Sequence, residues 1–363
     1  MLGRTIVLGL FVTAISGTVH AILPAVILLM PFSRSAYRAV VDTVEWAWLT
    51  NASALIELVA GVEVIATGVR PAPNDKRMII LCNHNNRLDW LFLWCLASRI
   101  GLCSSLKIAL KEGLRKAPFF GWATQAFLFV FFSRKDRNGD LAHLRATLGH
   151  GLGHGDDTVL LIFPEGTDLS PSNQALDAEF AKKKGLETYA HVLHPRVVGF
   201  AEAVTAFGDG LDAIYDVTVR YDNHPAVAAA ADPRPSEASA LFKGLWPRRV
   251  HFHCDRHAAS AIQGPSTAEW LTDAWTRKEK LLAASAAFPS PADGMGRPTF
   301  TYLSVLLGWA TVTIMLLMHI CSSHGWALRL YTLLGTATLE VFTRWGGLDA
   351  LERWWHPAGV RRR

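Results

Sequence analysis

The chain has 363 residues, of which 50% are hydrophobic, with a formal net charge of +5 and five cysteines. This content is enough for one large core or two smaller ones, together with membrane segments. The modest positive charge, with no basic block interleaved with aromatic residues, argues against nucleic acid as a partner. The cysteines show no paired spacing, which argues against a disulfide framework and suits a reducing compartment.

The N-terminal part begins with a long uncharged stretch. No charged side chain occurs from Thr5 to Ser33, which exceeds the ~20 residues needed to cross a bilayer. A signal peptide has an apolar core of only ~7 to 15 residues, so we predict a retained transmembrane anchor. The next apolar segment, Val44 to Val69, contains several glutamates. It predicts an interfacial helix, with a buried helix packed on the domain that follows as the alternative.

Short apolar runs then alternate with helix-like segments over residues 71–288. We predict strands at Met78–Cys82, Ser105–Leu110, Ala126–Phe132, Thr158–Phe163, Val197–Phe200, Asp216–Tyr221 and Arg249–His253. We predict helices at Asp89–Ile100, Gly139–Leu152, Asn173–Lys184 and Thr267–Ala286. This alternation indicates an α/β domain with a mostly parallel central sheet flanked by helices. Ala226–Ala240, rich in alanine and proline, is predicted to be a surface loop without a motif.

The run from Asn83 to Asp89 follows directly after the first of these strands. A strand that ends near His84 and a helix that begins at Asp89 would place an imidazole beside a carboxylate. Such a pair can act as a general base, because the carboxylate fixes the tautomer and stabilises the imidazolium. The alternative is structural, with His84 capping the helix and Asp89 favoured by the helix dipole.

The sequence does not offer an obvious protein nucleophile. It contains no G-x-S-x-G pattern, and Cys82 lies inside an apolar strand run. The proton would therefore come from a substrate hydroxyl, which makes direct acyl transfer the natural reaction. A second turn, Phe163 to Thr167, ends another strand at a proline and a glycine and exposes backbone N–H groups that suit a phosphate or an oxyanion.

Together these motifs resemble those of the glycerophospholipid acyltransferase family, whose members carry Asn-His-x-x-x-x-Asp and Phe-Pro-Glu-Gly-Thr. Gly121-Trp122, followed by an apolar run ending in Ser133-Arg134, resembles a further block, and His194-Pro195-Arg196 resembles another. The chain is most similar to the lysocardiolipin acyltransferase branch, through residues 193–196, 211–219, 249–253 and 346–348.

The resemblance implies acyl-coenzyme A dependent transfer to the free hydroxyl of lysocardiolipin, lysophosphatidylinositol or lysophosphatidylglycerol. It implies that His84 is the general base and Asp89 its orienting group. Acyl-coenzyme A is then a co-substrate, and neither a metal nor another cofactor is expected. The candidate substrate-binding residues are Arg134 for the acceptor phosphate, Glu165, Gly166 and Thr167 for the acceptor, and Lys111 and Asn83.

Three alternatives remain open at this point. The acceptor could be lysophosphatidic acid, the protein could be a non-catalytic membrane lipid-binding protein, or His84 could activate water in a hydrolase. The histidines and cysteine of residues 251–257 suit zinc, but no second set of ligands accompanies them. Lys111 belongs to a basic group that could also be ordinary solvated surface.

The C-terminal part contains a second uncharged stretch, Pro298 to Leu328, and a shorter one, Leu330 to Leu339. We predict domains at 1–70 (anchor and interfacial helix), 71–288 (acyltransferase) and 289–363 (membrane hairpin and basic tail). The distribution of basic residues places the catalytic domain in the cytosol. The family resemblance implies the endoplasmic reticulum, with mitochondria-associated membrane as the alternative. The expected partners are acyl-coenzyme A, lysophospholipid and the bilayer.

Overall fold

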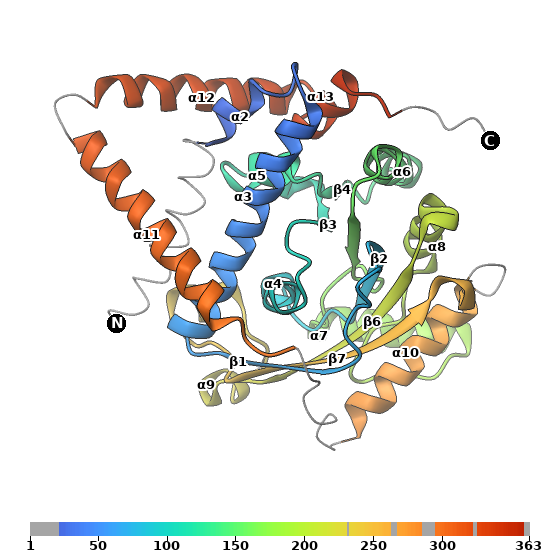
Figure 1. The fold of residues 1–363 in the computed structure, drawn as a ribbon. Helices are drawn as coiled ribbons and strands as arrows, with labels where there is room; N and C mark the ends of the chain where they lie inside the picture. Colours follow the sequence, from blue (N-terminus) through green and yellow to red (C-terminus); the bar gives the residue numbers. More distant parts are fainter. Residues whose placement is uncertain (1–21, 231, 263–266, 285–294, 322–324, 359–363) are drawn as a thin grey trace. The chain divides into compact units, whose positions relative to one another are not determined.

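The computed structural model describes residues 22–230, 232–262, 267–284, 295–321 and 325–358. The chain forms two compact units, and Figure 1 labels the helices and strands that they contain. Of the described residues, the first unit contains Ile56–Leu102 and those between 159 and 297. The second contains residues 22–55, Cys103–Thr158 and those between 298 and 358.

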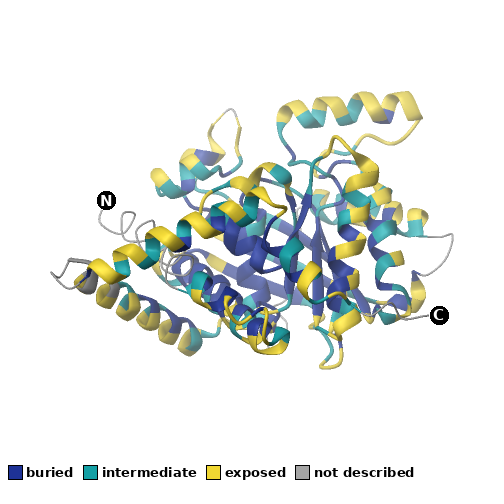
Figure 2. Cartoon of the chain, turned by 90° about the horizontal axis from the view of Figure 1, so that it is seen from above, coloured by how far each residue is buried: buried dark blue, intermediate teal, exposed yellow. Residues whose placement is uncertain are grey.

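Five strands form the sheet of the first unit, in the order β1-β7-β6-β2-β5. They are β1 (Glu63–Gly68), β2 (Arg77–Cys82), β5 (Thr158–Ile162), β6 (Ala213–Asp222) and β7 (Arg249–Ala258). The pairs β1–β7 and β2–β6 are parallel, whereas β6 and β7 are antiparallel. Nearly every residue of β2 and β5 is buried, and Figure 2 shows buried residues along the central strands. Burial on both faces is typical of parallel strands covered by helices.

The first unit also contains helices, some of which contact its strands. They are α4 (Asp89–Ile100), α7 (Pro171–Lys184), α8 (Val197–Phe207), α9 (Pro225–Ala228) and α10 (Thr267–Ala283), with a π-helical turn at Ala238–Phe242. The helix α4 contacts β1, α8 contacts β2, and α10 contacts both α8 and β6. The start of α7 is fixed by Ser170, whose hydroxyl accepts a hydrogen bond from the backbone N–H of Asn173.

The second unit contains a parallel pair of strands, β3 (Leu106–Lys111) and β4 (Val130–Phe132). Its helices are α2 (Leu23–Ile27), α3 (Arg34–Ala54), α5 (Phe120–Ala126), α6 (Arg137–His154), α11 (Thr299–Cys321), α12 (Trp326–Arg344) and α13 (Leu348–Trp355). The helix α3 contacts α11, α6 contacts β4, and α13 contacts α5.

The predicted interfacial helix at Val44–Val69 is wrong. Its first part belongs to α3, where Glu45 is fully buried and its carboxylate lies 2.9 Å from the ammonium of Lys107. Its last part is the strand β1, which pairs with β7 from a distant part of the sequence. The buried-helix alternative holds up to Ala54. The ammonium of Lys107 compensates the buried carboxylate of Glu45. Because Lys107 lies far along the chain, the residues around Glu45 could not predict this pair.

Most of the other predicted elements are confirmed. The α/β class is correct, as are strands β2, β3, β5, β6 and β7 and helices α4, α6, α7 and α10. The predicted strand Val197–Phe200 is instead the first turn of α8, because an apolar run of four residues suits a buried helix as well as a strand. The predicted strand Ala126–Phe132 is confirmed only from Val130 onward, since α5 occupies Phe120–Ala126.

The predicted membrane spans are not supported. Within the described ranges, we find no helix with both the length and the apolar character needed to cross a membrane. Most of the predicted N-terminal anchor, residues 5–21, lies outside the described residues. The C-terminal stretch forms α11 and α12, and α12 carries the charged residues Arg329, Glu340 and Arg344.

Candidate active site

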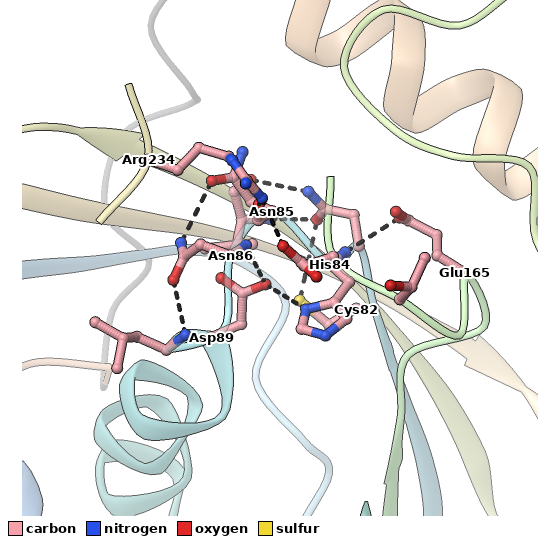
Figure 3. Close-up of polar contacts among 12 residues, drawn as sticks. Cys82, His84, Asn85, Asn86, Asp89, Glu165 and Arg234 are labelled. Carbon is pink, nitrogen blue, oxygen red and sulfur yellow. Dashed lines mark hydrogen bonds and ion pairs between the residues drawn. The ribbon is translucent and has the colours of Figure 1, made fainter. Parts of the chain in front are cut away.

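The turn between β2 and α4 brings together the histidine and aspartate that the sequence singled out. The strand ends at Cys82 and the helix begins at Asp89, as the motif predicts. His84 Nδ1 lies 2.9 Å from Asp89 Oδ2 (Figure 3). The carboxylate of Asp89 is fully buried, whereas the side chain of His84 is 18% exposed. A solvent-facing imidazole is therefore held by an inaccessible carboxylate.

Asp89 has two further hydrogen-bond donors. Its Oδ2 accepts from the backbone N–H of Asn86 at 3.0 Å, and its Oδ1 accepts from the hydroxyl of Tyr221 at 2.5 Å. Burial, followed by the nearby Asp89, raises the pKa of Tyr221 well above its usual value, so this hydroxyl stays a donor. An ionised carboxylate only accepts hydrogen bonds. Nδ1 of His84 therefore carries the proton, which leaves Nε2 free to accept one.

The main chain of His84 is bound by the turn that follows β5. Its N–H donates to Glu165 Oε1 at 3.1 Å, and its carbonyl accepts from the N–H of Leu169 at 2.8 Å. Its ring stacks on Phe163, with centroids 4.4 Å apart and an angle of 26° between the planes. The two sequence motifs thus meet at the ends of neighbouring strands, and the turn after β5 contacts the N–H, the carbonyl and the ring of His84.

Glu165 is buried among protein donors. In addition to the N–H of His84, its Oε1 accepts from the indole N–H of Trp275 at 3.1 Å, and its Oε2 accepts from the N–H of Leu193 at 3.2 Å. Burial raises the pKa of Glu165 to about 7. Only 2% of the residue is exposed, so its carboxylate faces the protein rather than solvent.

Gly166 has a left-handed backbone and a close neighbour. Its φ is 74°, and a Cβ at this position would lie 3.3 Å from both Cδ and Nε of Arg196. The backbone N–H of Arg196 donates to the carbonyl of Pro164 at 2.7 Å, which fixes this arginine against the turn. The neighbouring Thr167 accepts from the amide of Asn173 at 2.8 Å, which ties the turn to α7. The left-handed backbone therefore favours glycine here, and a Cβ would crowd the exposed side chain of Arg196.

Asn83 and Cys82 lie inside the protein. The amide of Asn83 donates to the carbonyl of Val219 at 3.1 Å and accepts from the N–H of Val219 at 2.8 Å, which links the end of β2 to β6. Burial raises the pKa of the Cys82 thiol well above its usual value. A neutral, buried thiol is a poor nucleophile.

Lys111 and Arg134 lie in the second unit, at one end of the β3–β4 pair. Lys111 is the last residue of β3 and pairs in register with Phe132 of β4, two residues before Arg134. Arg134 has a left-handed φ of 62°, and its backbone N–H donates to Asp140 Oδ2 at 2.8 Å. Both basic side chains are exposed, so the pair of parallel strands gathers two positive groups at its carboxyl edge.

Sequence reasoning missed three residues that contact these motifs. Tyr221 and Trp275 come from β6 and α10, and no local pattern marks them. Arg234 lies in the predicted loop Ala226–Ala240, where it is the only basic residue. Its Nη1 donates to the carbonyl of Asn85 at 3.2 Å (Figure 3). The loop therefore contacts the histidine motif. Its single arginine was the sequence feature that could have indicated this contact.

The histidines near residue 251 lie on β7. His253 Nδ1 is 3.0 Å from the hydroxyl of Thr67, on the neighbouring strand β1. Across the described residues, no group of histidine, cysteine, aspartate and glutamate side chains is arranged to hold a metal ion.

Comparisons with known proteins agree with this geometry. The family model described as Acyltransferase matches residues 63–222. Lysocardiolipin acyltransferase 1 of Danio rerio is 36% identical over 81% of this chain and 75% of its own length. Lysophosphatidylinositol acyltransferase 10 of Caenorhabditis elegans is 30% identical over 86% and 83%. The 1-acyl-sn-glycerol-3-phosphate acyltransferase 2 of Brassica napus is 30% identical over 82% and 76%.

These relatives match most of the chain, and the matched region contains both turns that surround His84. The motifs, their meeting at the strand ends and the similarity to whole relatives agree with one another. The chain therefore belongs to the glycerophospholipid acyltransferase family and is an acyltransferase.

Proposed function

We propose that this enzyme transfers a fatty acyl group from acyl-coenzyme A to the free hydroxyl of a lysophospholipid, with His84 as the general base. The observation that carries the proposal is the 2.9 Å contact between the partly exposed imidazole and the buried carboxylate of Asp89. A base of this kind contributes ~100- to 10,000-fold to a rate.

The reaction needs no covalent intermediate on the protein. Nε2 of His84 takes the proton of the acceptor hydroxyl while its oxygen attacks the thioester carbonyl. Asp89 stabilises the imidazolium that forms. As the new ester C–O bond is completed, the C–S bond breaks, and the imidazolium returns its proton to the leaving coenzyme A thiolate.

Other groups have positioning and binding roles in this proposal. Glu165 and Leu169 hold the backbone of the base through the hydrogen bonds described above. In the first unit, the exposed Arg196 beside Gly166 is suited to a phosphate, because a guanidinium can bind two phosphate oxygens at once. In the second unit, we propose that Arg134 binds the acceptor phosphate, as the family resemblance implies, and that Lys111 binds a phosphate of the lysolipid or of coenzyme A.

The names of the relatives suggest the acceptor class. We propose lysocardiolipin, lysophosphatidylinositol or lysophosphatidylglycerol as the acceptor. Lysophosphatidic acid is the second candidate, because plant relatives named 1-acyl-sn-glycerol-3-phosphate acyltransferases are also 30% identical over most of the chain.

A panel of these lysolipids, offered to the purified enzyme with one labelled acyl-coenzyme A and scored by product mass, tests the function. We expect a diacyl product from at least one acceptor and no thioester loss without an acceptor. Absence of product from every acceptor would reject the proposed function and favour a lipid-binding protein. Thioester consumption without any lysolipid would favour a hydrolase.

The helix α11 suggests how the enzyme meets lipid. Several of its large apolar side chains are exposed, including Phe300 at 84%, Leu307 at 67% and Met318 at 69%. We propose that these side chains contact a membrane of the endoplasmic reticulum, with mitochondria-associated membrane as the alternative. Flotation with liposomes tests the lipid contact, and a variant with Phe300→Asp and Leu307→Asp should float less. Unchanged flotation would reject the assigned surface.

A further inference from the structure

A second feature of the first unit lies beside the histidine motif. A cavity of about 490 Å³ is lined by the loop after β2, the start of α7 and the segment 232–237. We call it the polyol pocket and define it by Arg87, Asp168, Ser170, Ser172, Ser236 and Glu237. Its volume is within the ~300 to 1,000 Å³ of ordinary small-molecule sites.

The polyol pocket is attached to the loop that carries His84. Asn86 also lines it, and the N–H of Asn86 donates to Asp89 at 3.0 Å. Arg234, another lining residue, donates from Nη1 to the carbonyl of Asn85 at 3.2 Å and to Asp168 Oδ2 at 2.7 Å. A ligand in this pocket would therefore lie on the same loop as the proposed base.

Arg234 is already neutralised by protein carboxylates. Besides its bond to Asp168, its Nε and Nη2 donate to the two oxygens of Asp232, at 2.7 and 2.6 Å. These contacts fix the guanidinium as a wall of the pocket and leave it little attraction for a further anion. The contact with Asp232 also lowers the pKa of that carboxyl, so it stays ionised at neutral pH.

The remaining lining favours hydroxyl groups over phosphate. Three serines line the same cavity as Asp168, Asp232 and Glu237, and the acidic lining residues outnumber the two arginines. A phosphate would be repelled by this excess of negative charge, whereas a neutral polyhydroxyl group can donate to carboxylates and accept from Arg87 and serine. Sites of this type discriminate strongly, because a missing ligand hydroxyl leaves polar groups unpaired.

We propose that the polyol pocket binds the hydroxyl-rich headgroup of the acceptor lysolipid, beyond its phosphate. This inference rests on the proposed function and assigns a specificity role to the segment 232–237. An inositol and a glycerol headgroup share this chemistry, and lysophosphatidic acid lacks it. The enzyme should therefore prefer lysophosphatidylinositol or lysophosphatidylglycerol to lysophosphatidic acid carrying the same acyl chain.

The test fills the pocket with a bulky side chain. Ser172 is exposed near the start of α7 and is not a capping residue, so Ser172→Trp can add bulk without removing the cap at Ser170. Glu179→Trp is the matched control, because it places the same side chain on the same helix outside the lining residues. The readout is kcat/KM for the three lysolipids with one acyl-coenzyme A.

We expect the preference for the polyol lysolipids over lysophosphatidic acid to fall about tenfold or more in Ser172→Trp and to stay unchanged in Glu179→Trp. The polyol lysolipid whose kcat/KM falls most shows whether the pocket binds an inositol or a glycerol headgroup. An equal loss with all acceptors, an unchanged preference, or a wild-type preference for lysophosphatidic acid would overturn the inference.

A binding measurement separates this inference from the proposed function. Calorimetric titration with glycerophosphoinositol, glycerophosphoglycerol and glycerol 3-phosphate requires no catalysis. Tighter binding of a polyol compound that Ser172→Trp abolishes would support the pocket even if no transfer occurred. Equal binding of all three compounds would overturn it, even in an active acyltransferase.

Discussion

Two of the histidine–aspartate pairs in the first unit, His84–Asp89 and His194–Asp177, have nearly the same local geometry. His84 Nδ1 lies 2.9 Å from Asp89, and His194 Nδ1 lies 2.8 Å from Asp177. Each imidazole also stacks on an aromatic ring, Phe163 for His84 and Tyr189 for His194, with centroids 4.4 Å apart in both cases. The contact between imidazole and carboxylate therefore does not by itself indicate a base.

The surroundings distinguish the two pairs. Asp89 is fully buried, whereas the side chain of Asp177 is 13% exposed. The side chain of His84 is 18% exposed and that of His194 only 8%, so the pair with the more buried carboxylate has the more accessible imidazole. The first pair also follows the end of a central strand, where sites gather in α/β sheets. Placement in the sheet and access to solvent, rather than pairing, mark the first as the candidate base.

Among changes that keep both imidazoles, the largest effect is expected at the carboxylates. Asp89→Asn should lower kcat by roughly 1,000-fold, because an amide can fix the wrong tautomer and no longer stabilises the imidazolium. The matched change Asp177→Asn should alter kcat less than about threefold. Steady-state kinetics with the preferred acceptor measures both. Equal losses in the two variants would remove the distinction between the pairs.

Glu165 gives the next largest effect, on stability rather than on rate. Burial raises its pKa to about 7 in the folded protein, from an ordinary value of 4.5. The folded state thus binds the proton more tightly than the unfolded state. Protonated Glu165 therefore adds to the free energy of unfolding. This stabilisation, roughly 3 kcal/mol, is fully present below pH 4.5 and is lost as the pH rises through about 7.

Glu165→Gln should remove this part of the pH dependence. Urea unfolding at pH 5 and pH 8 should show a smaller difference in free energy of unfolding for the variant than for the unchanged protein. Glu279→Gln is a control, because Glu279 also accepts backbone N–H groups but is only partly buried. An identical pH dependence with glutamine at position 165 would contradict the assigned role of burial.

The two tyrosines near the pairs should produce a smaller effect. Tyr221 donates to the carboxylate of Asp89 at 2.5 Å, whereas the hydroxyl of Tyr189 contacts the hydroxyl of Thr276 at 2.8 Å. A hydrogen bond to a charged group contributes ~1.5 to 3 kcal/mol, and a neutral one about 1 kcal/mol. Tyr221→Phe should therefore cost more stability than Tyr189→Phe, and only Tyr221→Phe should lower kcat, by about tenfold. The reverse order would show that Asp89 does not depend on this hydroxyl.

The smallest expected effect concerns the glycine of the second turn. Gly166→Ala should destabilise the protein by ~1 to 2 kcal/mol, because its φ of 74° is costly for alanine and the new Cβ would press on Arg196. Gly185→Ala is a matched control, since it also has a left-handed φ but open space around it. Chemical denaturation measures both. A larger loss for Gly185→Ala would argue against crowding by Arg196.

The sequence predicts the local part of the site well. The spacing of His84 and Asp89 determines their contact once a strand ends before one and a helix begins at the other, and both elements are confirmed. Tyr221, Trp275 and Arg234 could not be predicted, because they come from distant elements that folding brings to the same strand ends.

The errors in the fold have a similar origin. The strand β1 was not predicted, because it lies within a longer apolar segment and its partner β7 lies far along the chain. The start of α8 resembled a strand, because a run of four apolar residues does not distinguish the two structures. Local periodicity thus did not determine whether these segments form a helix or a strand, and contacts with distant parts of the chain did.

The most direct test of the central claim compares the two histidines. Acyl transfer should be measured for His84→Ala and His194→Ala, with circular dichroism and acceptor binding as checks on folding. We predict that His84→Ala abolishes transfer while the fold and acceptor binding are retained, and that His194→Ala keeps most of the activity. Substantial transfer by folded His84→Ala would contradict the account.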